Sequence, residues 1–187
     1  MAALCSLARC TAQDSLPAMR ETTAAFTHLC ALLRHTSPLE AVALHFLSSL
    51  ASQHKGLSSE GRAAELLFLQ TRIIVLLEDR APAAALQLLL ECALHAARHS
   101  LPDTACDLLD AAFSVYQQYC ALPPTALGGL SALIHGLSRV RGLSRERFDA
   151  FAQLVCRYAT SLPPRQDKVR HCAHAWTCKD GRVLRSS

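Results

Sequence analysis

The chain has 187 residues, of which 51% are hydrophobic and 18% are charged, and this composition excludes a chain that is disordered throughout. Leu (33) and Ala (31) far outnumber Val (7) and Ile (3), which predicts an all-α protein because β-branched residues favour strands and Leu and Ala favour helices. The net charge of +4 comes from scattered basic residues with no run of four or more and without interleaved aromatics, a pattern that argues against nucleic-acid binding.

Helix-breaking residues recur along the chain roughly every 20 to 22 residues. Proline is tolerated in the first turn of a helix, where its missing N–H costs nothing, so each position predicts a helix start. The breakers are Pro17, Pro38, serines at 58–59, Pro82, Pro102, Pro123, Ser144 and Pro163. They predict a short N-terminal helix followed by helices near 18–35, 38–54, 59–79, 82–99, 102–120, 124–141, 145–160 and 165–177.

Serines beside several breakers strengthen these predicted starts. Ser37, Pro38 and Glu40 match a capping box, in which the Ser and Glu side chains satisfy free backbone N–H groups. Ser100, Ser144 and Ser161 begin looser versions of the same signal.

Apolar residues between the breakers recur at helical spacing, as in Phe148, Phe151, Val155 and Ala159. The segment from Pro102 has the same pattern and ends with Tyr116 and Tyr119 on the predicted buried face. Helices of about 17 to 20 residues joined by short connections must run antiparallel to their neighbours. They form about four hairpins with a repeat near 41 residues, in the range of HEAT-like arrays.

The predicted architecture is therefore a right-handed α-solenoid of antiparallel HEAT-like hairpins over residues 17–178. Residues 1–16 would form an N-terminal segment and residues 179–187 a truncated tail. A compact bundle is the alternative, but most helices have a single broad apolar stripe, which favours stacked hairpins.

Nine cysteines lie mostly inside apolar helical stretches, where a free Cys behaves as a small hydrophobe. Their number is odd and no secretory signal precedes them, so reduced thiols in the cytoplasm are expected. The sequence also contains no stretch of 18 uncharged apolar residues, which predicts no membrane span. The cysteines are Cys5, Cys10, Cys30, Cys92, Cys106, Cys120, Cys156, Cys172 and Cys178.

His171, Cys172, His174 and Cys178 form the one metal-like cluster in the sequence. Zinc requires ligands from at least two anchored points, and a second Cys-x-x-Cys cluster is missing. Cys172 and His174 are also two residues apart, so on a helix they point to different faces. A helix end with a buried Cys is the favoured interpretation, and no metal or cofactor is predicted.

The sequence offers no catalytic constellation. No Cys occurs in a Gly-rich turn that would expose and activate a thiolate, and acidic residues never converge in pairs suited to acid–base catalysis. Gly128 and Gly129 lie inside a helical apolar pattern, which favours close helix packing over a phosphate-binding loop. A non-enzymatic protein is therefore expected.

Five residues are candidates for partner binding. Arg139, Arg141, Arg145 and Arg147 straddle one predicted inter-helix connection, and they form either a solvated turn or a partner-facing rim. Trp176 ends the last apolar stripe, where a single tryptophan serves either the hairpin core or an interface.

Five short segments occur in the same order and at similar spacing as in a known family. They are residues 80–94 (RAPAAALQLLLECAL), 111–116 (AAFSVY), 139–144 (RVRGLS), 172–176 (CAHAW) and 179–184 (KDGRVL). The stretch from about Ala63 to Trp176 thereby resembles the C-terminal half of the large α-solenoid subunit of retromer, the vacuolar protein sorting-associated protein thirty-five family. In that family RVRGLS corresponds to a segment between two helices.

This resemblance implies a non-enzymatic scaffold subunit of an endosomal coat. The matching half of the family holds the small metallophosphoesterase-fold subunit in the concave face of its terminal hairpins, in complex with other retromer subunits. The chain would then be cytoplasmic, peripheral on endosomal membranes through the complex, and active in retrograde endosome-to-Golgi protein transport.

The sequence also departs from the family pattern. The family's acidic loop is replaced by the neutral residues 117–124, and residues 1–55 match poorly. The family's N-terminal half, with its P-R-L-Y-L motif, is absent, which predicts a truncated solenoid. Two other classes stay open at this point: a stand-alone helical-repeat adaptor unrelated to endosomes, and a zinc-dependent or thiol enzyme.

Overall fold

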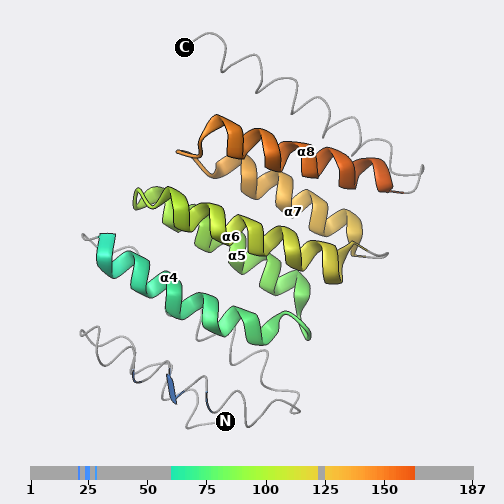
Figure 1. Cartoon of the computed structure of the whole chain (residues 1–187). Helices are drawn as coiled ribbons and strands as arrows, with labels where there is room; N and C mark the ends of the chain where they lie inside the picture. Colours follow the sequence, from blue (N-terminus) through green and yellow to red (C-terminus); the bar gives the residue numbers. More distant parts are fainter. Residues whose placement is uncertain (1–20, 22–23, 26–27, 29–59, 122–124, 163–187) are drawn as a thin grey trace.

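The structure, a computed structural model, describes residues 21, 24–25, 28, 60–121 and 125–162 (Figure 1). Within these residues it contains helices and no strand, in agreement with the predicted all-α class. Glu21, Ala24, Ala25 and His28 are helical and exposed. The remaining elements are α4 (Glu60–Ile74), a 3₁₀ turn η2 (Val75–Leu77), α5 (Pro82–Arg98), α6 (Pro102–Val115), a π-helical turn η3 (Tyr116–Cys120), α7 (Ala126–Arg139) and α8 (Arg145–Ser161).

Five predicted helices, from 59–79 to 145–160, are present, and their ends lie within two residues of the prediction when η2 and η3 are counted with α4 and α6. Pro82 and Pro102 are the first residues of α5 and α6, as the spacing of breakers predicts. The capping box at Ser37 and the helices predicted after residue 162 lie outside the described residues.

The described helices pack mainly against their neighbours in the chain. Helix α5 packs most extensively against α6 and also contacts α4 and α7, while α7 contacts α8. In Figure 1, α6 and α8 lie in front of α5 and α7, so two layers of helices are visible. Successive helices run antiparallel, and α5 and α7 therefore lie side by side in the same direction.

The core between the layers consists of the apolar stripes predicted from the sequence. Leu86, Leu89 and Ala93 of α5 are buried, as are Phe151 and Val155 of α8. Burying one such side chain contributes about 1.5–3 kcal/mol, so these stripes dominate the stability of the helical array.

The predicted burial of Tyr119 is wrong. The helical pattern places it on the buried face after Tyr116, but its side chain is 37% exposed and its hydroxyl donates a hydrogen bond to Asp79. The reason is the π-helical turn at the end of α6, whose i→i+5 hydrogen bonds widen the turn and rotate later residues off the stripe.

Of the helix caps predicted at Ser144 and Ser100, the first is confirmed and the second is wrong. Ser144 caps α8 as predicted, because its Oγ accepts a hydrogen bond of 3.3 Å from the backbone N–H of Arg147. Ser100 does not cap α6, whose first turn has no side-chain cap. It instead has φ +57° and ends α5, where the N–H groups of Ser100 and Leu101 donate to Ala97 and Ala96 as in a Schellman motif.

Close packing at the glycine pair is confirmed for Gly129 and not for Gly128. A Cβ at Gly129 would lie 2.8 Å from Cδ2 of Tyr116, whereas a Cβ at Gly128 would meet no atom within 4 Å. Gly136, two helical turns further on, packs equally closely, since its Cβ would lie 2.7 Å from Cδ2 of Leu90. Helix α7 therefore approaches α5 and η3 where it lacks side chains.

The four described cysteines, Cys92, Cys106, Cys120 and Cys156, are free thiols, and the first three are buried. The Cys92 thiol donates to Oε1 of Gln70 at 3.4 Å, and this glutamine is the buried polar side chain of the described core. None of the described helices is both long and apolar enough to cross a membrane.

Candidate functional site: a groove between α5 and α7

A groove of about 480 Å³ opens between α5 and α7. The two helices run in the same direction. Residues at helical spacing on α5 therefore lie opposite residues at the same spacing on α7. The small residues of α7 let the helix approach α5 at Gly136, and they leave open space beside Gly128. Its apolar wall consists of Leu90, Leu94, Gly128, Ala132 and Gly136, and its polar rim of Gln87, Glu91, Ser131, His135 and Arg139.

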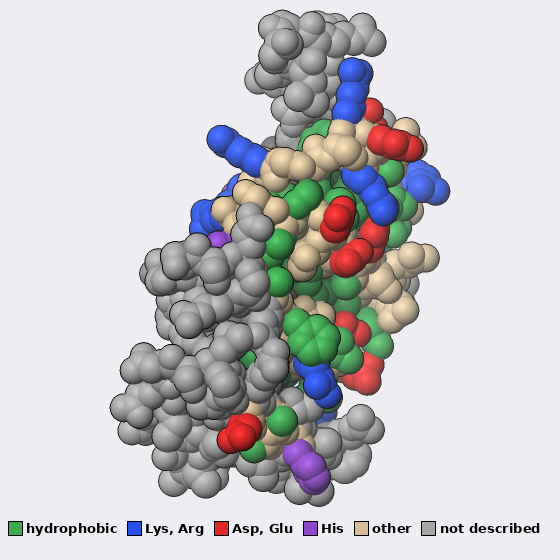
Figure 2. Space-filling model, turned by 60° about the vertical axis from the view of Figure 1, so that its left-hand side comes forward, with side chains coloured by type: hydrophobic (Ala, Val, Ile, Leu, Met, Phe, Trp, Pro, Cys, Tyr) green, Lys and Arg blue, Asp and Glu red, His purple; other side chains and the backbone are tan. Residues whose placement is uncertain are grey.

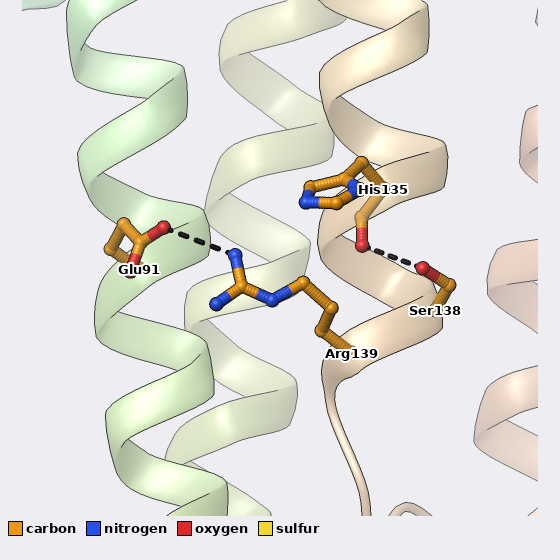
Figure 3. A network of polar contacts seen from close by, with 4 residues as sticks. All are labelled: Glu91, His135, Ser138 and Arg139. Atoms are coloured by element: carbon orange, nitrogen blue, oxygen red, sulfur yellow. Dashed lines mark hydrogen bonds and ion pairs between the residues drawn. The ribbon is translucent and has the colours of Figure 1, made fainter.

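An ion pair crosses this groove. Nη1 of Arg139 lies 3.5 Å from Oε1 of Glu91, so the pair joins the end of α7 to the middle of α5 (Figure 3). Both side chains are substantially exposed, and such a pair contributes about 0–1 kcal/mol to stability. Its effect is therefore to orient Arg139 along the rim. His135 projects toward α5 one turn earlier on α7 (Figure 3).

The groove continues past the ion pair into a second recess of about 530 Å³. Leu94 and Arg139 line both spaces, so the two form one continuous surface along α5 and α7. The second recess is lined by Leu94, Ala97, Arg98, Ser138, Arg139 and Arg141. One end of the groove thus combines an apolar floor with three guanidinium groups.

The structure separates the four arginines predicted as one rim. Arg139 and Arg141 line the groove, whereas Arg145 pairs with Asp149 along α8 and Arg147 pairs with Asp110 of α6, both at 3.8 Å. They separate because the connection turns between the helices, so that Arg147, in the first turn of α8, faces α6. On the face shown in Figure 2, acidic and basic side chains are interspersed with hydrophobic ones. Trp176 lies outside the described residues.

Three of the four described thiols are poorly suited to nucleophilic chemistry. Burial, reinforced by the neighbouring Glu91 carboxylate, raises the pKa of Cys92 to about 12, and burial also raises the pKa of Cys106 and Cys120. These three thiols stay protonated at neutral pH. Among the described residues, no group of three or more His, Cys, Asp or Glu side chains could hold a metal ion. The cluster from His171 to Cys178 lies outside them.

Sequence reasoning did not identify the groove itself. Leu90 and Leu94 belong to the stripe that predicts the core, and nothing in the stripe shows that its edge opens to solvent. One usable signal was present, because Gly128, Ala132 and Gly136 recur every four residues and place a strip of small residues on one face of α7. Arg98 was missed because its role depends on the end of α5 meeting the connection after α7.

Comparison with known proteins adds no relative: no protein-family model, curated protein or solved structure matches this chain.

Proposed function

We propose that the chain is a non-enzymatic scaffold of a retromer-type endosomal coat, built as a right-handed α-solenoid of HEAT-like hairpins. The observation that carries the proposal is the place of the family-like segments in the fold. Residues 80–94 lead into α5, residues 111–116 end α6, and residues 139–144 form the connection between α7 and α8. That last segment lies between two helices, as its counterpart does in the family.

The packing of the described helices supports the solenoid part of the proposal. Each helix contacts its neighbours in sequence, α7 also packs on α5, and α5 and α7 form one layer behind α6 and α8 (Figure 1). An array with such local contacts can extend in both directions and present a long surface to a folded partner.

The partner that follows from the resemblance is the metallophosphoesterase-fold subunit of retromer, held together with other retromer subunits. The chain would associate peripherally with endosomal membranes through this complex and serve retrograde endosome-to-Golgi transport. Recognition would rest on buried apolar anchors framed by polar side chains, as in other protein interfaces.

The direct test is complex formation between the purified full chain and the metallophosphoesterase-fold subunit from the same organism. We expect the two proteins to co-elute in size-exclusion chromatography and to bind with a Kd in the micromolar range or tighter by calorimetry. An unrelated metallophosphoesterase-fold protein serves as the control. Separate elution at concentrations well above micromolar would overturn the proposal.

The groove between α5 and α7 favours one alternative, a stand-alone helical-repeat adaptor that binds peptides or folded proteins away from endosomes. The apolar wall and polar rim of the groove come from this chain alone. The two functions differ in the cell: a tagged chain that follows endosomal markers supports the coat scaffold, and a distribution that ignores them supports the adaptor.

A further inference from the structure

The basic end of the groove combines three guanidinium groups from three different segments. Arg98 comes from the end of α5, Arg139 from the end of α7, and Arg141 from the connection that follows, and all three line the same recess. Arg139 is paired with Glu91. Within the described part of the chain, no carboxylate forms an ion pair with Arg98 or Arg141, so the recess carries an excess of positive charge.

The backbone holds these arginines around the recess. The Schellman-type turn at Ser100 fixes the end of α5 directly after Arg98. On the other side, Val140 is buried and has an extended backbone, and its N–H donates to the carbonyl of Gly136 at 3.2 Å. Val140 is the buried anchor between two exposed residues, Arg139 at the end of α7 and Arg141 in the connection.

The chemistry of this recess matches a phosphate group. Guanidinium groups donate paired hydrogen bonds to phosphate oxygens, and a dianionic phosphate can engage more than one of them. Nearby, Leu90 and Leu94 provide an apolar floor, and the groove is open beside Gly128, where a Cβ would meet no atom within 4 Å. A ligand that fits both parts carries a phosphate next to an apolar side chain.

The dimensions favour an extended peptide as the carrier. Leu90 and Arg98 are eight residues apart on α5, a rise of about 12 Å. An extended peptide covers this length in three to four residues. The arginines line a recess between two helices, a shape that admits a single chain more readily than a flat bilayer surface.

We propose that the groove between α5 and α7 binds a phosphoserine or phosphothreonine peptide in which an apolar residue lies three or four positions from the phosphate. Arg98 and Arg141 hold the phosphate, Arg139 closes the site from the rim, and the apolar side chain lies over Leu90 and Leu94. This binding goes beyond the proposed function and requires no other coat subunit.

The test measures fluorescence anisotropy of a labelled peptide, Gly-Leu-Ala-Ala-phosphoserine-Ala-Ala-Leu-Gly, titrated with the purified full chain at physiological salt. Leucines on both sides of the phosphoserine cover either orientation of the peptide. We expect at least tenfold weaker binding for the unphosphorylated peptide and for a phosphopeptide with both leucines replaced by serine. Equal binding of phosphorylated and unphosphorylated peptides would overturn the proposal.

Two double variants with the same change of charge locate the site. Arg98→Gln with Arg141→Gln should weaken phosphopeptide binding at least tenfold, whereas Arg145→Gln with Arg147→Gln, on α8, should leave it within twofold. Circular dichroism verifies that both variants are folded. Equal losses of phosphopeptide affinity in the two variants would show that binding depends only on the overall positive charge, and would overturn the assignment of the phosphate site to Arg98 and Arg141.

A competition arm separates the sources of phosphate. Inorganic phosphate should compete weakly and vesicles containing phosphatidylinositol phosphate should compete no better than neutral vesicles. Binding to those vesicles with none to the peptide would overturn the peptide as ligand. Complex formation with the metallophosphoesterase-fold subunit is measured separately, so a failure of either proposal is distinguishable from a failure of the other.

Discussion

At the scale of single residues, Gly129 and Gly136 set how closely α7 approaches the rest of the core. Each meets a large side chain where its own Cβ would be, Tyr116 for Gly129 and Leu90 for Gly136. The two contacts differ in how they can respond to a larger residue. Leu90 is an aliphatic side chain beside an open groove and can change rotamer, whereas the Tyr116 ring is packed in the core against Tyr158, with ring centroids 5.0 Å apart.

We therefore predict that Gly129→Ala destabilises the protein by about 1–3 kcal/mol, because the added methyl group overpacks the Tyr116 ring. Gly128→Ala is the matched control. It adds the same methyl group where no atom lies within 4 Å, and the higher helix propensity of alanine should stabilise by up to about 1 kcal/mol. Urea unfolding of both variants measures the difference, and equal effects would contradict the packing argument.

Two buried acidic groups predict a loss of stability at alkaline pH. Burial raises the pKa of Cys92 from about 9 to about 12, and burial, reinforced by Tyr158, raises the pKa of Tyr116 from about 10 to about 12. Between those values the unfolded chain loses protons that the folded chain keeps. The stability is therefore complete below about pH 9 and falls as the pH rises toward 12.

Urea unfolding under reducing conditions at about pH 7.5, 9.5 and 10.5 measures this fall. Cys92→Ala and Tyr116→Phe should each make the decrease shallower, since each removes one titrating group. Tyr116→Phe should also cost about 0.5–1.5 kcal/mol at neutral pH, because the tyrosine hydroxyl donates to the carbonyl of Ala126 at 3.2 Å. A decrease of the same steepness in all three proteins would refute the assignment.

At the scale of elements, the start of α8 depends on a single side-chain cap. The Oγ of Ser144 accepts a hydrogen bond from the N–H of Arg147. We predict that Ser144→Ala destabilises the protein by about 1 kcal/mol, whereas Ser144→Asp preserves the cap. Thermal unfolding of the two variants decides the matter, and a Ser144→Ala variant as stable as the parent would show that the cap contributes nothing.

The end of α5 allows a change in the opposite direction. Ser100 has a φ of +57°, a conformation in which a side chain is strained and glycine is not. Ser100→Gly should therefore stabilise the protein by about 0.5–1 kcal/mol in urea unfolding. Ser100→Val, with a β-branched side chain at the same position, should destabilise it. A destabilised glycine variant would mean that the serine hydroxyl contributes more than the backbone strain costs.

These two serines also show how far the sequence could be read. Both stand beside a predicted helix start, and local chemistry correctly assigned Ser144 as a cap. It failed for Ser100 because the sequence cannot show which of two adjacent helices the residue serves. Tyr119 failed for a similar reason, since the π-helical turn that exposes it has no mark in the apolar spacing.

The same limit applies to the candidate site. Single helices were predictable because each follows from its own breakers and stripe. The groove depends on the distance between α5 and α7, and that distance follows from the contact of Gly136 with Leu90, which are 46 positions apart in the sequence. Arg139 and Arg141 were identified from their clustering, but their separation from Arg145 and Arg147 follows from the direction of α8.

At the scale of the whole molecule, stability should be unevenly distributed. Helix α5 packs against α4, α6 and α7, whereas α8 packs against α7 and, through the rings of Phe151 and Tyr158, against α6 and η3. We predict that hydrogen exchange followed by mass spectrometry shows the slowest exchange in peptides from α5 and faster exchange in peptides from α8. The reverse order would show that packing between neighbouring helices does not determine local stability.

The two glycines of α7 also have an evolutionary consequence. A larger residue at position 136 packs more easily when position 90 shrinks in the same lineage, and positions 129 and 116 are tied more strictly because the Tyr116 ring is held in the core. In related chains, therefore, these positions should covary as pairs. A leucine at position 90 would accompany glycine at position 136, and an alanine or valine at position 90 would accompany alanine at position 136. Paired substitutions of this kind would indicate the spacing of the two helices without a structure.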